Sequence, residues 1–271
     1  MRLSQALRPK EPRNLAVTLA VAAVLLLLYA IAAWLWPFSP KRGFGLAFGI
    51  FAALAFVFEM LYPARRPRAR PLGTARAWIQ AHVYVGALAM LAVWIHADGL
   101  PHGGFGWWLF LLSLWATISG LLGVWAQKTL PLALAEGLRV EALYERIPDL
   151  VDQLVAEADT LVAEASDVLD RFYQQELRPS LSTLRPSWSY VFDVRSGRER
   201  ALEPFGQIGG YVGADEKAKV DDLLSLYTEK IELDAQWSVQ RVLRLWLWLH
   251  VPPAALLMGL LVIHVFTWLW Y

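Results

Sequence analysis

Five apolar stretches, each long enough to cross a lipid bilayer as a helix, constrain this chain more than any other feature. A helix needs about 20 predominantly apolar residues to span the hydrocarbon core. The stretches cover approximately residues 14–36, 44–62, 75–97, 105–127 and 242–270. The hydrophobic share of 57% agrees with lipid as the main solvent. We therefore predict an all-α integral membrane bundle with five transmembrane helices in contact with membrane lipid.

Charge is divided unevenly along the chain, although the formal net charge is only +1. Residues 128–240 hold 21 acidic and 12 basic residues, whereas the rest of the chain holds 3 acidic and 13 basic residues. This division indicates a basic-flanked membrane domain with an acidic soluble insertion. We predict four transmembrane helices in 1–127, an acidic, mainly helical soluble domain in 128–240, and a fifth transmembrane helix in 241–271 that completes the bundle.

Basic residues also predict the orientation of the spans. They are Arg2, Arg8, Lys10 and Arg13 before the first stretch, and Arg65, Arg66, Arg68, Arg70 and Arg76 in the loop after the second. The positive-inside rule places both groups in the cytoplasm. The N-terminus and residues 128–240 are then cytoplasmic, and the third and fifth stretches run in the same direction. The predicted location is a bacterial inner membrane that the chain crosses several times.

The insertion contains two amphipathic helical patterns. The first runs from Ile147 to Phe172, with apolar residues at i, i+3, i+4 and i+7. The second begins near residue 214, and no residue between Ile231 and Trp246 breaks it. We expect the second helix to continue into the fifth span and to couple the insertion rigidly to it. The two apolar stripes either cover each other as a helical hairpin or form a docking surface.

Four of the five histidines lie in two of the apolar stretches with the same spacing. His82 and His96 belong to the third stretch, and His250 and His264 belong to the fifth. Fourteen residues of helix rise about 21 Å and return to within about 40° of the starting face. Because the two stretches are predicted to run parallel, His82 is expected to face His250 at the inner depth, and His96 to face His264 at the outer depth.

Histidines in membrane helices serve as packing residues, proton relays or metal ligands. A zinc or copper site needs further ligands, and the spans offer only Glu59 and Asp98 as carboxylates. A haem needs only two axial protein ligands, because the porphyrin supplies four nitrogens. The chain has no Cys, which excludes covalent c-type attachment and cysteine-ligated iron–sulfur clusters within it. The spacing therefore favours two bis-histidine b-type haems, with structural or proton-relay histidines as the alternative.

The two histidine segments resemble those of membrane dihaem b-type cytochromes. In the cytochrome b subunit of quinol–cytochrome c oxidoreductases, two parallel helices each supply two haem ligands at this spacing, and the bacterial cytochrome b561-like group is also similar. The resemblance covers about half the chain and implies that His82, His96, His250 and His264 are axial ligands of the haem iron. The chain departs from the family in lacking a PEWY-type quinol-site motif and in carrying the acidic insertion between its haem helices.

Three further residues are candidate cofactor-binding residues. Gly86 lies one turn after His82, where a small residue lets a macrocycle approach the backbone. Arg76 and Arg244 each precede an inner histidine by six residues and are candidate partners of haem propionates. Ordinary helix packing and topology-setting charges explain these three residues equally well.

Three small residues in the fourth stretch, Ser119, Gly120 and Gly123, form a patch suited to a haem bundle or to close helix packing. Pro252 and Pro253 directly follow His250 and predict a kink above the inner ligand. The kink either aims the imidazole or is a tolerated feature of a membrane helix.

These patterns predict transmembrane electron transfer by a quinone-linked subunit of a membrane redox complex. Quinone or quinol is the expected small partner, because lipid-soluble carriers reach such haems from within the bilayer. The expected protein partner is another redox subunit, an iron–sulfur, flavin or c-type cytochrome protein, with a basic surface that docks on the acidic insertion. No nucleic-acid partner is expected. The alternative is a membrane anchor or assembly factor that recruits a partner through its cytoplasmic helical domain.

Overall fold

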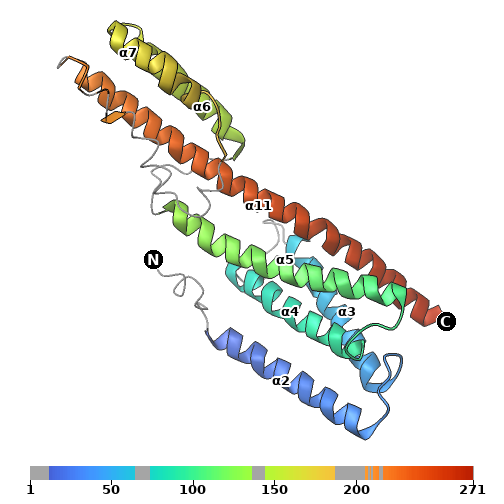
Figure 1. The fold of residues 1–271 in the computed structure, drawn as a ribbon. Helices are drawn as coiled ribbons and strands as arrows, with labels where there is room; N and C mark the ends of the chain where they lie inside the picture. Colours follow the sequence, from blue (N-terminus) through green and yellow to red (C-terminus); the bar gives the residue numbers. More distant parts are fainter. Residues whose placement is uncertain are drawn as a thin grey trace. The chain divides into compact units, whose positions relative to one another are not determined.

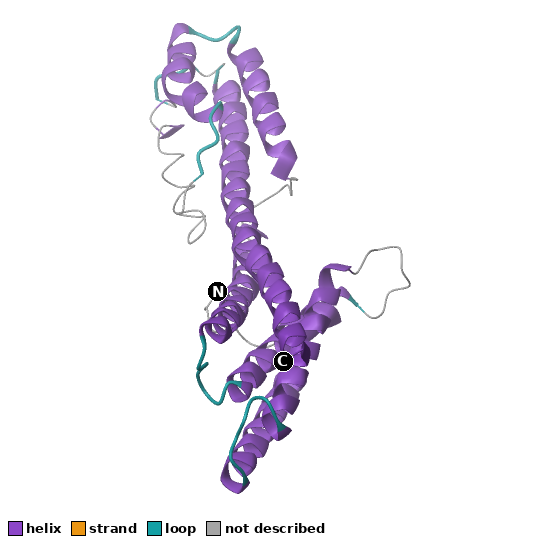
Figure 2. Cartoon of the chain, turned by 90° about the vertical axis from the view of Figure 1, so that its right-hand side faces the viewer, coloured by secondary structure: helices purple, strands orange, loops and turns teal. Residues whose placement is uncertain are grey.

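The computed structural model describes residues 12–64, 74–135, 144–186, 205–206, 208, 210–213 and 216–270. Helices are the regular structure throughout these ranges, and no strand occurs in them, which confirms the all-α prediction for this part of the chain (Figure 2). The chain divides into two compact units. The first unit is Met1–Trp125 with Trp246–Tyr271, and the second is Ala126–Leu245. These boundaries lie close to those drawn from charge at 127/128 and 240/241.

Five helices are long and apolar enough to cross a membrane (Figure 1). They are α2 (Pro12–Leu35), α3 (Gly43–Ala64), α4 (Ala75–His96), α5 (Gly104–Ala135) and α11 (Lys217–Trp270). At most 28% of the residues in the apolar window of any of these helices are buried within the structure. Most of their apolar side chains therefore face outward, which water would oppose and lipid would favour.

Buried apolar side chains, two of them alanines, form the centre of the first unit. Ala55 and Phe56 of α3 pack with Ala89 of α4 and Leu257 of α11, and all four are buried. Small residues at helix contacts let the backbones approach closely. Ala89 lies midway between the two histidines of α4, and Leu257 lies midway between those of α11. An apolar layer therefore separates the two histidine levels.

The end of α4 is fixed by its turn. Asp98 (φ 55°) and Gly99 (φ 93°) both have left-handed backbone conformations, which end the helix at His96. The N–H of Gly99 donates to the carbonyl of Trp94 at 3.0 Å, closing the last turn. The carboxylate of Asp98 accepts a hydrogen bond from the hydroxyl of Tyr29 on α2 at 2.8 Å. This contact ties α2 to the end of α4.

The second unit is built from short helices and the first part of α11. In chain order the short elements are η1 (Tyr144–Arg146), α6 (Ile147–Val162), α7 (Asp167–Phe172), the π-helical turn η2 (Tyr173–Leu177) and α8 (Arg178–Leu181). The continuous amphipathic helix predicted over 147–172 is therefore wrong, because the chain turns between α6 and α7.

Ser166 explains this break. Its backbone is extended and its hydroxyl caps α7 by accepting from the N–H of Leu169. The N–H and the hydroxyl of Ser166 both donate to the carboxylate of Glu216, each at 2.6 Å. These two bonds lower the pKa of the Glu216 carboxyl. In the sequence pattern Ser166 is one polar position among apolar ones. In the structure it holds the turn between α6 and α7 through Glu216, which lies 50 residues later.

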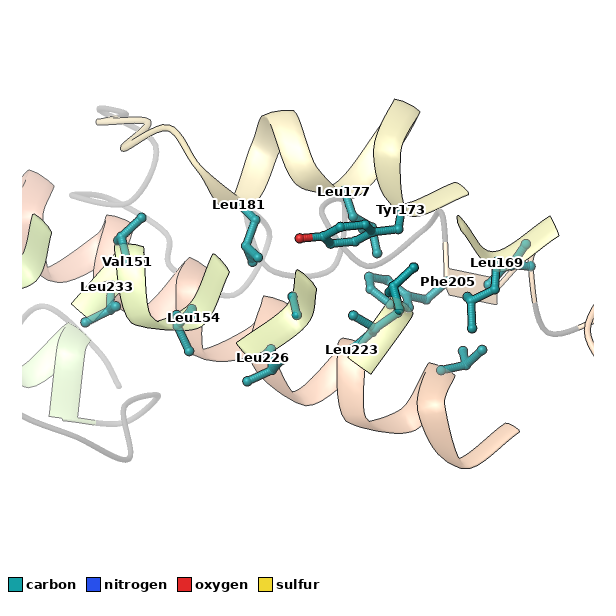
Figure 3. Packing of buried hydrophobic residues seen from close by; sticks show 14 of the residues in the cluster. Val151, Leu154, Leu169, Tyr173, Leu177, Leu181, Phe205, Leu223, Leu226 and Leu233 are labelled. Atoms are coloured by element: carbon teal, nitrogen blue, oxygen red, sulfur yellow. The ribbon is translucent and has the colours of Figure 1, made fainter. Parts of the chain in front are cut away.

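The apolar stripes of the second unit cover one another (Figure 3). Side chains from α6, from the segment α7–α8 and from α11 meet in one buried cluster, as the hairpin alternative predicted. Its members are Ile147, Val151, Leu154, Ala158, Val162, Leu169, Tyr173, Leu177, Leu181, Phe205, Ile208, Val220, Leu223, Leu226 and Leu233. Burying a leucine, valine or phenylalanine side chain contributes about 1.5–3 kcal/mol, so the cluster stabilises the unit.

Within this unit, helix α11 buries charged side chains as well as its apolar face. Lys230 and Asp234 are both almost fully buried and form an ion pair with a Nζ–Oδ2 distance of 2.7 Å. The Lys230 ammonium also donates to the carbonyl of Thr183, and the Asp234 carboxylate accepts from the N–H of Arg185. These bonds satisfy charges that would otherwise oppose burial. They also attach the segment after α8 to α11.

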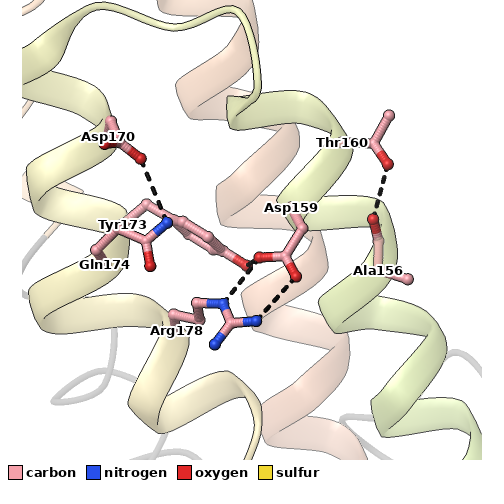
Figure 4. Close-up of polar contacts among 7 residues, drawn as sticks. All are labelled: Ala156, Asp159, Thr160, Asp170, Tyr173, Gln174 and Arg178. Carbon is pink, nitrogen blue, oxygen red and sulfur yellow. Dashed lines mark hydrogen bonds and ion pairs between the residues drawn. The ribbon is translucent and has the colours of Figure 1, made fainter.

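Asp159, Tyr173 and Arg178 form a polar cluster at the edge of the second unit (Figure 4). The Tyr173 hydroxyl donates to the Asp159 carboxylate at 2.6 Å, and Arg178 donates to both of its oxygens at 2.9 and 3.1 Å. The bonds from Arg178 and then from Tyr173 hold the pKa of Asp159 below its usual value. A depressed pKa means that the carboxylate stabilises the fold above its unfolded pKa, and that this stability is lost as pH falls through the folded value.

We expect Asp159→Asn to lower the free energy of unfolding at pH 7 by about 1 kcal/mol or less, because solvent screens this half-exposed group. Chemical unfolding of the purified full chain, followed by helical circular dichroism, measures the difference between the two proteins. The difference should begin to shrink below about pH 4, the ordinary pKa of an aspartate in the unfolded chain, and should continue to shrink as pH falls through the lower pKa of folded Asp159. An equal difference at pH 7 and pH 3 would contradict the ionic origin of the effect.

Candidate functional site

Helices α4 and α11 bring the four histidines together as two pairs. The ring centroids of His82 and His250 lie 6.4 Å apart, with their planes at 82° (the first histidine pair). Those of His96 and His264 lie 6.3 Å apart, with their planes at 83° (the second histidine pair). These are the partners that the parallel arrangement predicts.

The spacing within each pair fits a single metal ion between two imidazoles. A metal–imidazole bond is about 2 Å long, and a ring nitrogen lies about 1 Å from its ring centroid, so two axial imidazoles have centroids roughly 6 Å apart. Both pairs have this spacing. No group of three or more His, Cys, Asp or Glu suited to a metal ion occurs in the described part of the chain. Two protein ligands per level suit haem iron, which needs no others.

His96 has its ring fixed by α3. Its Nδ1 lies 2.8 Å from the carbonyl oxygen of Gly45. A carbonyl oxygen can only accept, so Nδ1 carries the hydrogen and Nε2 keeps the lone pair that a metal needs. The Cβ of any side chain at Gly49 would lie 2.7 Å from Nδ1 and Cε1 of this imidazole. Glycine at position 49 is therefore required for the ring to occupy this place.

His250 has its ring fixed by α5. The Ser119 hydroxyl donates its single hydrogen to the carbonyl of Trp115 at 2.6 Å. Its oxygen, 2.9 Å from Nδ1 of His250, therefore accepts a hydrogen from that nitrogen, which again leaves Nε2 as the ligating atom. A Cβ at Gly120 would contact Cε1 at 3.4 Å. The Trp246 ring stacks on the imidazole at 5.6 Å between centroids.

His82 is paired with a carboxylate. Its Nδ1 lies in close contact with Oε2 of Glu59 on α3. The Glu59 side chain is only 13% exposed, and its other oxygen, Oε1, is buried without a hydrogen-bond partner in the described part of the chain. A Cβ at Gly86 would lie 3.8 Å from this carboxyl group. The structure therefore places Gly86 against Glu59, and its predicted contact with a macrocycle stays a prediction.

Three of the four imidazoles thus have Nδ1 held by a carbonyl, a hydroxyl or a carboxylate. Histidines that bind metals almost always donate their second ring N–H to such a partner, which fixes the tautomer and the ring orientation. The fourth imidazole, His264, stacks on Phe105 at the start of α5, with centroids 6.1 Å apart. The residues present therefore fit two bis-histidine haems.

The prolines after His250 change the backbone hydrogen bonds of α11, which continues through them. Pro253 has no N–H, so it cannot donate to the carbonyl of Leu249 four residues earlier. The indole N–H of Trp115 donates to that carbonyl instead, at 2.8 Å. A second indole, Trp246, donates to the carbonyl of Ser119 at 2.7 Å. Both bonds join α5 to the turn of α11 that leads into His250.

The predicted propionate partners have different positions. The guanidinium of Arg244 forms an ion pair with Glu145 and lies 4.0 Å from the ring centroid of Tyr144. Both partners belong to the second unit, so Arg244 already has an anionic partner there. The side chain of Arg76 lies outside the described residues. Propionate binding by either arginine stays a prediction.

Sequence reasoning missed Gly45, Gly49 and the role of Glu59. Two glycines four residues apart on one helix were an available signal, since small residues in this spacing mark a close approach to another element. An ionisable residue inside an apolar span was a second signal, because its burial in a membrane is costly and usually functional.

Comparison of the chain with models of protein families, with curated proteins and with solved structures finds no match.

Proposed function

We propose that this protein binds two b-type haems and conducts single electrons across a membrane. One observation carries the proposal: four histidines form two pairs at the spacing of axial ligands, and in three of them the Nδ1 partner leaves Nε2 for a metal. The haems, when bound, supply reversible one-electron chemistry at iron.

The chain's own residues have three tasks in this function. The imidazoles are the axial ligands. Gly45 and Ser119 accept a hydrogen from Nδ1 of His96 and His250, so that these two rings keep one tautomer, and Glu59 lies against Nδ1 of His82. Gly49 and Gly120 give two of the rings their space. The layer around Ala89 and Leu257 keeps water from the region between the two levels. The levels are about 21 Å apart along α4 and α11.

The setting of this function belongs to the proposal. The five apolar helices favour a multi-pass membrane protein, and the basic loop favours a bacterial inner membrane with residues 128–240 in the cytoplasm. A quinone or quinol in the lipid would exchange electrons at one level. A second redox subunit, an iron–sulfur, flavin or c-type cytochrome protein, would exchange them at the other.

The test is the cofactor content of the purified full chain. We expect two b-type haems per chain, both low-spin, by pyridine haemochrome assay and by a reduced-minus-oxidised visible spectrum. The chain should be produced with haem synthesis supplied, so that incomplete loading does not lower the ratio. A chain that folds with one haem or none would contradict the proposal and would favour the alternative of a membrane anchor or assembly factor.

A further inference from the structure

The two histidine pairs differ in the charge that their partners carry. In the first pair, Nδ1 of His82 meets the carboxylate of Glu59, and Nδ1 of His250 meets a neutral hydroxyl. In the second pair, Nδ1 of His96 meets a neutral backbone carbonyl, and the ring of His264 stacks on an apolar ring. A carboxylate therefore touches a ligand of the first pair and no described ligand of the second.

A carboxylate that accepts the Nδ1 hydrogen makes an imidazole a stronger electron donor. A more electron-rich axial ligand stabilises the oxidised iron over the reduced iron, and hydrogen bonding around a haem is one of the means by which proteins set its potential. The effect grows where water is excluded. The Glu59 side chain is mostly buried, so an ionised carboxylate at this position acts on His82 at short range with little screening.

Asp98 is a second carboxylate among the described residues of the first unit, and its hydrogen-bond partner is not a histidine. It lies in the turn after α4, and its carboxylate accepts a hydrogen bond from the Tyr29 hydroxyl at an exposed position. Solvent and salt weaken the influence of such a charge. The direct contact of Glu59 with His82 should therefore dominate.

We propose that Glu59 makes the first histidine pair the lower-potential haem site, so that electrons pass downhill from the first pair to the second. This inference rests on the proposed haem binding and adds a direction to it. In the orientation that the basic loop predicts, the direction is from the cytoplasmic side of the membrane to the outer side. Glu59 acts through His82, so it is a positioning residue and a ligand-tuning residue.

A purely structural role for Glu59 makes a different prediction. If the contact served only to join α3 to α4, its neutral isostere would loosen the bundle without a selective effect on one potential. A contact that only joins two helices does not require the second carboxyl oxygen to be buried without a hydrogen-bond partner. Oε1 of Glu59 is such an oxygen in the described part of the chain. The midpoint potential therefore separates the two roles.

The experiment measures midpoint potentials in chains that retain one haem each. His96→Ala keeps the first pair, and His82→Ala keeps the second, so that neither measurement contains haem–haem coupling. Glu59→Gln and the matched carboxylate control Asp98→Asn are then each combined with His96→Ala. Asparagine suits position 98 because it tolerates the left-handed backbone there. Optical redox titration of each purified chain gives the potential.

We expect the midpoint potential of the first-pair haem to lie below that of the second-pair haem by at least about 59 mV. This corresponds to a tenfold difference in the equilibrium constant of a one-electron reduction. Glu59→Gln should raise the first-pair potential by a similar factor, and Asp98→Asn should leave it unchanged.

The inference is overturned if the first-pair potential equals or exceeds the second, or if Glu59→Gln shifts it by less than about threefold. If Glu59→Gln fails to bind haem, the comparison of the two single-haem chains with native Glu59 still decides the order of potentials. A wild-type chain without haem contradicts the proposed function itself, and the haem assay reveals this before any potential is measured.

Discussion

His82→Ala and His250→Ala should each abolish the same haem, and His96→Ala and His264→Ala should each abolish the other. Each haem depends on one imidazole from α4 and one from α11, whose rings pair at 6.4 and 6.3 Å. Removing either imidazole leaves that iron with a single axial ligand from the protein. The four variants should therefore give two spectra, each lacking one low-spin component, with the haem content reduced from two to one.

His102→Ala is the matched control for these four variants. The fifth histidine lies in the loop between α4 and α5 and is exposed. Its removal should leave both haem components and the haem content unchanged. If His82→Ala and His264→Ala were to abolish the same component, the pairing of α4 with α11 described above would be wrong.

Gly49→Ala should selectively remove or displace the second-pair haem. The new Cβ would lie 2.7 Å from Nδ1 and Cε1 of His96, closer than such atoms pack, so the imidazole must move away from the carbonyl of Gly45. The ligand would lose both its place and its fixed tautomer. We expect a fall of about 10- to 100-fold in haem affinity at this level, as is typical when such partners are lost. The first-pair component should keep its normal spectrum.

Gly259→Ala tests whether this effect is specific. Gly259 lies in the apolar part of α11, and no atom is within 4 Å of the place where its Cβ would be. Alanine at either position raises helix propensity by about 0.5–1 kcal/mol, so a difference between the two variants isolates the steric effect on His96. Normal occupancy of the second pair in Gly49→Ala would show that this contact does not position the ligand.

Local sequence patterns were sufficient for the helices and for the placing of the histidines along them. A run of about 20 apolar residues has few stable alternatives to a helix in lipid, and the helical repeat then fixes the face and depth of every side chain. For this reason the five apolar helices, the uninterrupted α11 and the equal spacing of His82–His96 and His250–His264 could be predicted from the chain alone.

Contacts between distant segments lay beyond such patterns. Ser166 ends one helix and starts another because Glu216, 50 residues later, accepts its two hydrogens. Arg244, predicted as a propionate partner, binds Glu145, which is 99 residues earlier. A periodic pattern records which residues are apolar, but it contains no information on which polar atoms will meet.

The partners of the imidazoles show this limit most clearly. The sequence determined that four histidines would stand at two levels of two helices, because spacing along a helix is a local property. Only the tertiary structure decided that Gly45, Ser119 and Glu59 would meet Nδ1 of His96, His250 and His82. Those contacts depend on how α3 and α5 pack against α4 and α11, which is set by close approach through small residues. The difference between a neutral carbonyl and a carboxylate at this position, which distinguishes the two pairs, therefore arises from packing.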